Sequence, residues 1–185
     1  MEKSNRVILD AKQFDLTIKR LAHQLIENHN EFTDTVILGM QPRGLFLANR
    51  IQAELLAINK KYKVQVGSLD TTFYRDDYRR QDNPLIPSKT QVDFIIEDKK
   101  VILIDDVLFT GRSVRAGLDA MLAFGRPKKV ELLVLINRRY ERDLPIQAKY
   151  IGKNVHSVTS ERVEVSWASK DGEDKVILYT PANDC

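Results

Sequence analysis

The segment of residues 101–121 constrains the fold more than any other part of the chain, because it joins a buried strand, a polar turn and a helix in one stretch. It opens with Val101-Ile102-Leu103-Ile104, a run typical of a strand buried on both faces and too short for a buried helix. After the polar turn, apolar residues return at helical spacing, so we expect a helix to begin near Gly111. Strand and helix in this order are typical of an α/β fold with a mainly parallel central sheet.

The polar turn combines an acidic pair, Asp105 and Asp106, with the sequence Thr110-Gly111-Arg112-Ser113. A helix N-terminus attracts anions, and a glycine lets the backbone approach them closely. Carboxylates are poor neighbours for a bare phosphate but good acceptors for vicinal hydroxyls and good outer partners for hydrated magnesium. The pattern therefore predicts a ligand with a diol at one end and a phosphate at the other, such as a ribose 5-phosphate group.

An acidic pair after a hydrophobic strand is often only a helix cap, and receiver-type signalling domains also place acidic residues there. The complete string is more specific, and it resembles the phosphoribosyl pyrophosphate-binding motif of type I phosphoribosyltransferases. The resemblance implies a sheet flanked by helices, with a flexible lid loop and a small hood region. It also implies that Asp105 and Asp106 hold the ribose hydroxyls and, through water and substrate, Mg²⁺. The expected nucleotide contacts are Val107, Leu108, Phe109, Thr110, Gly111, Arg112 and Ser113.

Bulk composition sets broad limits on the protein. A chain of 185 residues with 43% hydrophobic and 30% charged residues predicts one soluble globular domain over residues 1–185. The net charge of +3 permits nucleic-acid binding without demanding it. A lone cysteine at the last position, no visible signal peptide and no apolar run of membrane-spanning length predict a cytoplasmic protein that does not bind membranes.

A second strand-to-helix turn follows the apolar run of residues 36–38 and contains Pro42, Arg43 and Gly44. Ligands of open α/β sheets bind at this carboxyl edge of the strands, although many such turns bind nothing. Beside the central segment, the turn resembles the pyrophosphate loop of the same transferases. There Arg43 and the backbone on either side of it would hold the diphosphate. Relatives often carry threonine at the position of Pro42, so one backbone N–H donor is lost here.

Residues 73–92 form a long polar connection with two prolines. A connection of this length is either a surface insertion or a functional lid. The charged residues at its base favour a lid, since charged groups meet a ligand as a lid closes. The sequence Tyr74-Arg75-Asp76-Asp77 resembles the flexible catalytic loop of type I phosphoribosyltransferases, which implies a catalytic role for Arg75.

The apolar run of residues 130–136 predicts another central strand, and the charged loop after it faces the same edge of the sheet. The resemblance implies that Ile136, Asn137 and Arg138 read the base. Relatives commonly have Asp-Arg-Gly-His where this chain reads Asn-Arg-Arg-Tyr, so base selectivity stays open. Short strands are expected near residues 148–151, 163–167 and 176–179, with a hairpin turn at Asp171-Gly172.

The resemblance extends over nearly the whole chain to one bacterial subfamily, the pyrimidine-operon attenuation regulators that also have uracil phosphoribosyltransferase activity. It implies that phosphoribosyl pyrophosphate and uracil give UMP and diphosphate with magnesium, in a homodimer or dimer of dimers that binds pyrimidine-operon leader RNA. A basic RNA-binding surface and scattered solubilising charge are equally good interpretations of His23, Arg138, Arg139, Arg142, Lys149, Lys153 and Arg162. Two alternatives are a purine-base phosphoribosyltransferase and a non-catalytic, nucleotide-sensing RNA-binding regulator.

Overall fold

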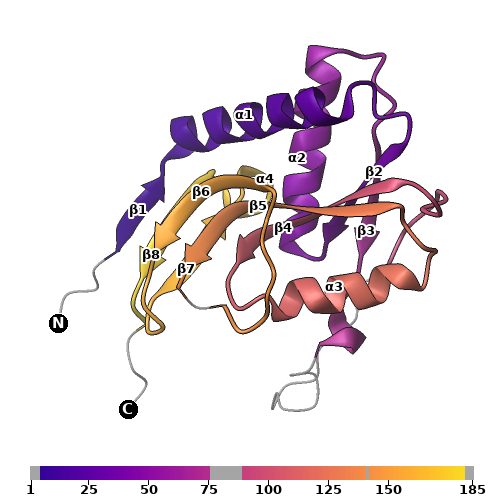
Figure 1. Ribbon diagram of the computed structural model, residues 1–185. Coiled ribbons are helices and arrows are strands. Elements are labelled where there is room, and N and C mark those ends of the chain that lie inside the picture. Colours follow the sequence, from indigo (N-terminus) through magenta and orange to yellow (C-terminus); the bar gives the residue numbers. More distant parts are fainter. Residues whose placement is uncertain (1–4, 76–88, 141, 182–185) are drawn as a thin grey trace.

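The computed structural model describes residues 5–75, 89–140 and 142–181. Its centre is a parallel sheet of five strands in the order β3-β2-β4-β5-β6 (Figure 1). None of the helices in these ranges is both long and apolar enough to cross a membrane. The strands are β2 (Thr35–Met40), β3 (Gln65–Leu69), β4 (Lys100–Leu108), β5 (Lys129–Arg139) and β6 (Tyr150–His156).

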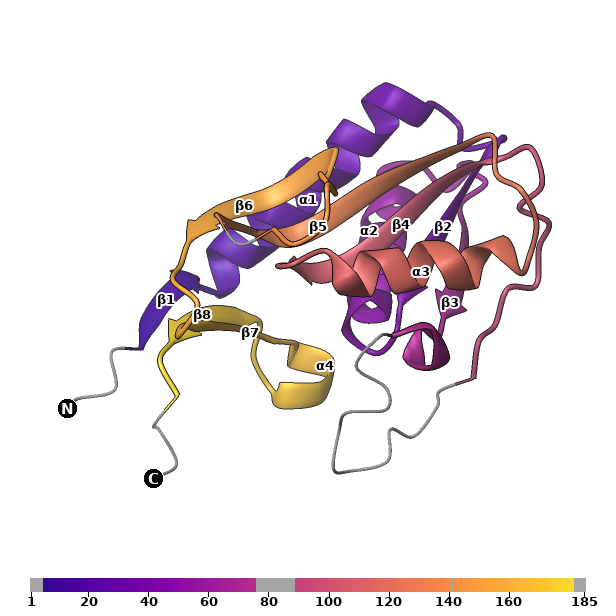
Figure 2. The ribbon, with the colours of Figure 1, turned by 60° about the horizontal axis from the view of Figure 1, so that its bottom comes forward.

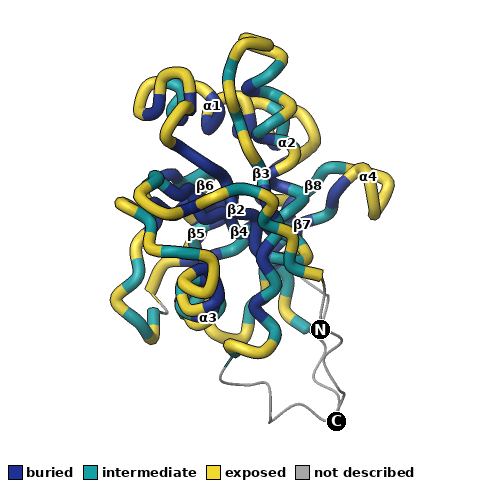
Figure 3. The backbone as a smooth tube through the Cα atoms, turned by 90° about the vertical axis from the view of Figure 1, so that its right-hand side faces the viewer, coloured by how far each residue is buried: buried dark blue, intermediate teal, exposed yellow. Residues whose placement is uncertain are grey.

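Helices cover both faces of this sheet, with α1 (Ala11–His29) and α2 (Arg43–Ile58) on one face and α3 (Arg112–Leu122) on the other (Figure 1). Side chains alternate across a strand, so Ile102 and Ile104 pack into the core under α1 and α2, and Leu103 packs into the core beside α3. Covering both faces explains why the apolar runs are continuous, and Figure 3 shows the central strands as the most buried part of the chain.

A separate antiparallel sheet forms the hood region, with strand order β1-β8-β7 and the short helix α4 (Ala168–Asp171) beside it (Figure 2). The buried Trp167 fixes it to α1, because its ring packs edge-on against Phe14 at 5.1 Å. An ion pair of 2.8 Å between Arg50 on α2 and Asp174 adds a second attachment. The three strands are β1 (Arg6–Leu9), β7 (Arg162–Ser166) and β8 (Lys175–Tyr179).

The predicted α/β fold with its parallel sheet, flanking helices and hood region is confirmed, and α3 begins at Arg112 directly after its N-cap Gly111. Three details differ. The acidic pair lies within β4 rather than after it, because pairing with β5 continues as far as Leu108 and Asn137. Strand β6 begins at Tyr150 and extends to His156, and Asp171 ends helix α4 instead of forming a hairpin turn.

Candidate active site

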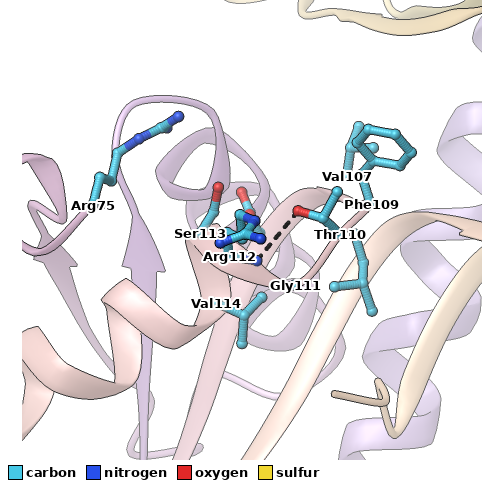
Figure 4. A pocket seen from close by; sticks show the side chains of 10 residues that line it. Arg75, Val107, Phe109, Thr110, Gly111, Arg112, Ser113 and Val114 are labelled. Carbon is cyan, nitrogen blue, oxygen red and sulfur yellow. Dashed lines mark hydrogen bonds between the residues drawn. The ribbon is translucent and has the colours of Figure 1, made fainter. Parts of the chain in front are cut away.

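A cavity of about 240 Å³ opens where β4 ends and α3 begins (Figure 4). It adjoins a second hollow of about 190 Å³. The two share four lining residues, which are Arg75, Asp105, Val107 and Ser113. The fold thus brings together three segments that are far apart in the sequence, at the carboxyl edge of the parallel sheet. These segments are residues 40–43 at the end of β2, residues 71–75 after β3, and residues 105–114.

Of the acidic pair, Asp105 borders both hollows and Asp106 borders the second. Asp106 is only 8% exposed, and Asp105 is half-buried with its Oδ1 accepting a 2.9 Å hydrogen bond from the Asp106 amide. Burial, with the neighbouring charge of Asp106, raises the pKa of Asp105 well above its ordinary value. Burial also raises the pKa of Asp106, against the opposing effect of the Arg43 charge. Such a pair is stabilised by a cation or by hydroxyl donors placed in the cavity.

The start of α3 suits an anion, whereas the acidic pair suits a cation or hydroxyl donors. Gly111, with a φ of +92°, is the N-cap residue and has no side chain that would cover the first N–H groups of the helix. These groups and the hydroxyls of Thr110 and Ser113 border the cavity, which makes this end a suitable anion cradle. Arg112 lines it too, while its Nε holds Asp143 of the following loop at 2.9 Å.

Arg43 borders the second hollow, and Gly44 follows it in the first turn of α2. Arg43 Nη1 donates to the carbonyl oxygen of Val165 in β7, and its charge acts on Asp106, so one guanidinium links the hood to the acidic pair. Pro42 follows a cis peptide bond and borders the same hollow. Gly44 packs the first turn of α2 against β4 directly beneath Asp105.

Gly44→Ala is expected to weaken the site more than it weakens the fold. The added Cβ would overlap the carbonyl oxygen of Ile104 and lie 3.0 Å from the Cα of Asp105, so α2 has to move away from β4. We expect a loss of about 1–3 kcal/mol in unfolding free energy, with a higher KM for phosphoribosyl pyrophosphate, the substrate that the sequence resemblance implies. Gly172→Ala is the control for lost stability. Its φ of +87° strains an alanine, but no atom lies within 4 Å of the missing Cβ, so this variant should lose stability without a change in KM. An unchanged KM in Gly44→Ala at reduced stability would contradict this role.

Arg75 reaches both hollows from the short 3-10 helix η1 (Thr72–Tyr74). This turn is held in place from two sides. Asp70 Oδ1 accepts a 3.0 Å bond from the Thr72 amide, and Arg115 of α3 donates to the Tyr74 carbonyl at 3.2 Å. The predicted lid residues Asp76 and Asp77 lie outside the described residues.

The three residues predicted to read the base lie beyond the lining of the two hollows. Ile136 is fully buried in the core. The Asn137 amide is engaged by Asn154 at 2.8 Å and by Arg142 at 2.7 Å. Arg138 is only 5% exposed and its guanidinium stacks on the ring of Phe109, which does line the cavity. Direct base contact by these residues stays a prediction.

The predicted basic surface needs one correction. Arg138 is buried because its side chain packs against Phe109, so it is not part of any exposed patch. Lys149 is exposed but pairs with Glu131 at 2.7 Å, at the edge of the sheet opposite to the cavity. The exposed members are His23, Arg139, Lys153 and Arg162, while Arg142 is half-buried.

Sequence and structure comparisons agree with this geometry. A family model described as phosphoribosyl transferase domain matches residues 4–170. The chain belongs to this family. It is 43% identical to the bifunctional protein PyrR of Desulfosudis oleivorans, over 98% of this chain and all of that protein. It is also 43% identical to the protein of the same name from Clostridium novyi, over 94% of this chain and 96% of that one.

Two solved structures that share this fold are purine-base transferases. The hypoxanthine phosphoribosyltransferase of Trypanosoma cruzi superposes with a TM-score of 0.71 at 14% identity, covering 96% of this chain and 97% of that one. A hypoxanthine-guanine phosphoribosyltransferase of Bacillus anthracis also reaches 0.71, at 17% identity, covering 95% and 98%. At these identities the likeness shows the fold alone.

Several residues at the site have no distinct signal in the sequence. Met40, Gln41 and Thr71 line the second hollow, and Asp143 pairs with Arg112 from across the cavity rim. Each is an ordinary strand-end or loop residue, and only the parallel register of β3, β2 and β4 brings the first three to one edge. Position at the carboxyl end of a predicted strand is the one indication that sequence offers for them.

Proposed function

We propose that this phosphoribosyltransferase transfers the ribosyl phosphate of phosphoribosyl pyrophosphate to uracil, giving UMP and diphosphate. The observation that supports the reaction class is the pair of adjoining hollows, where the acidic pair and the N-terminus of α3 lie a few residues apart. The choice of uracil rests on the bifunctional PyrR relatives at 43% identity, which are the pyrimidine-operon regulators that the sequence resembles.

Each side chain has a distinct task in this proposal. Asp105 and Asp106 accept hydrogen bonds from the ribose hydroxyls and stabilise the positive charge that develops on the sugar ring. The first turn of α3 holds the 5-phosphate. Arg43 and Arg75, in the second hollow, offset the charge of the departing diphosphate. No side chain has to act as nucleophile, so rate enhancement comes from positioning and electrostatics.

Magnesium fits the donor set of this site. Two adjacent carboxylates with raised pKa values offer hard oxygen ligands in a polar cavity, and Mg²⁺ in such sites commonly takes one or two carboxylates plus phosphate oxygens and water. Asp105 and Asp106 would therefore hold it through water and substrate. When bound, the ion would neutralise charge on the diphosphate.

Diphosphate release tests the proposal directly. Purified protein is given phosphoribosyl pyrophosphate and Mg²⁺, with and without uracil, and with excess chelator as a further arm. We expect release that depends on both uracil and Mg²⁺. No uracil-dependent release over background would overturn the enzymatic assignment and favour a non-catalytic nucleotide sensor.

A second candidate function is binding of pyrimidine-operon leader RNA in response to UMP, by a homodimer or dimer of dimers. The observation that favours it is the exposed group of Arg139, Tyr140 and His156 at the neighbouring ends of β5 and β6. The Tyr140 side chain is 79% exposed and packs edge-on against His156 at 5.3 Å. Cations beside an exposed aromatic ring suit single-stranded RNA.

RNA binding is tested by filter binding of the organism's own pyrimidine leader at several salt concentrations, with and without UMP. Contacts to several phosphates give a steep fall of affinity with salt, and Arg139→Gln should reduce that slope by about one. Equal affinity for the leader and for an unrelated RNA of the same length would remove the regulatory half of the proposal.

A further inference from the structure

Phe109 has an unusual place in the cavity. It follows β4 directly and, of the described residues that line the cavity of about 240 Å³, it is the aromatic one. Figure 4 shows Phe109 and Arg75 on opposite sides of the cavity, with Thr110 and Ser113 between them. In the proposed function, the first turn of α3 holds the 5-phosphate and Arg75 contacts the diphosphate. The side of the cavity that Phe109 lines is therefore left for the third part of the ligand, which is the base.

The ring of Phe109 is supported from behind. The guanidinium carbon of Arg138 lies 3.7 Å from the ring centroid, a distance at which the planar group stacks on the ring and covers one of its faces. Phe109 is nevertheless half-buried rather than buried, and it lines the cavity. The part of the ring that Arg138 leaves uncovered thus borders the cavity, where a flat ligand group can stack on it.

Arg138 is itself held by the turn between β6 and β7. Its Nε donates to Ser157 Oγ at 2.8 Å, and its Nη2 donates to the carbonyl oxygens of Val158 and Glu161 at 3.1 and 2.9 Å. The turn is closed on itself, since Glu161 Oε2 accepts from the Val158 amide at 2.8 Å. A planar fork with several donors suits this arrangement, whereas a lysine ammonium does not.

We propose that Phe109 is the platform on which the pyrimidine ring stacks, and that Arg138 is a positioning residue that fixes the platform. Arg138 then acts on the base through Phe109 and does not read its edge. This inference rests on the proposed function, because it names a pyrimidine as the occupant of this side of the cavity. It gives Phe109 a role in base affinity that is separate from ribose and phosphate binding.

Steady-state kinetics of Phe109→Leu and Phe109→Tyr separate this role from a structural one. Stacking of a base on an aromatic side chain is worth enough that its loss should raise the KM for uracil about tenfold. We expect that rise in Phe109→Leu, with the KM for phosphoribosyl pyrophosphate within about twofold of wild type. Phe109→Tyr keeps the ring and should behave as wild type. Phe124→Leu, an exposed phenylalanine beyond the far end of α3, is the matched control.

Arg138→Lys tests the support of the platform. It should raise the KM for uracil as Phe109→Leu does, and the double variant should be no worse than Phe109→Leu alone, because both changes remove one interaction. An unchanged uracil KM in Phe109→Leu, or an equal rise in both KM values, would overturn the inference while the wild type still uses uracil. Absence of uracil turnover in the wild type and in Phe124→Leu would instead overturn the proposed function together with this inference.

Discussion

Asp105→Asn is expected to lower kcat/KM for the phosphoribosylation of uracil by about a hundredfold to a thousandfold, the cost typical of losing one preorganised charge contact to a transition state. The same change should leave the protein at least as stable as wild type at pH 7. Burial raises the pKa of Asp105, so its contribution to folding is favourable at low pH and is lost as the pH rises through the folded-state pKa. Ionisation of Asp105 therefore costs folding free energy, and the neutral asparagine removes that cost.

The asparagine keeps an oxygen that accepts from the Asp106 amide, so the local backbone contact at 2.9 Å is retained. Thermal unfolding and steady-state kinetics on one preparation measure both effects. Asp15→Asn on α1, in a solvent-exposed pair with Lys19, is the control and should change neither quantity appreciably. Full activity in Asp105→Asn, or a large fall in its melting temperature, would contradict the assigned role.

Glu131→Gln is expected to remove about 3 kcal/mol of unfolding free energy at pH 7. Burial disfavours the Glu131 carboxylate, but hydrogen bonds from Lys129, Lys149 and Tyr150 outweigh burial and lower its pKa to about 2. A lowered carboxyl pKa stabilises the fold above the ordinary value of 4.5, and this stabilisation is lost as the pH falls towards 2. The difference between wild type and variant should therefore shrink below pH 4.5.

His29 at the end of α1 belongs to the same cluster, with its Nε2 3.0 Å from Glu131 Oε2. Burial lowers the pKa of His29 below 6.5, so it too destabilises the fold as the pH falls below that value. Urea unfolding at pH 7 and pH 3 measures the effect, with Glu173→Gln in the exposed pair with Lys175 as control. A wild-type-to-variant difference that is the same at both pH values would show that charge on Glu131 is not the cause.

The framework of the fold can be predicted from the sequence because it depends on local patterns. The apolar runs at residues 36–38 and 101–104, and the run at 130–136 that only Glu131 interrupts, form the three central strands, and Gly111 is the N-cap of α3. The local sequence pattern is enough to predict these strands and this helix start. Burial of a strand on both faces requires apolar residues in succession, and the conformational freedom of glycine affects only its own turn.

What the sequence did not predict depends on contacts between distant residues. The role of Arg138 is an example, because a charged residue in a charged loop is expected at the surface. Its burial follows from the carbonyl oxygens that the 157–161 turn offers and from the ring of Phe109, none of which a linear pattern pairs with it. The extension of β4 through the acidic pair likewise depends on the register with β5.

A competition assay tests the central claim most directly. Wild-type protein, phosphoribosyl pyrophosphate and Mg²⁺ are mixed with equal concentrations of uracil, hypoxanthine and guanine in one reaction, and the nucleotides formed are separated by chromatography. We predict UMP as the dominant product. Formation of IMP or GMP in its place would contradict the assignment of uracil and make the loop after β5 the determinant of purine use.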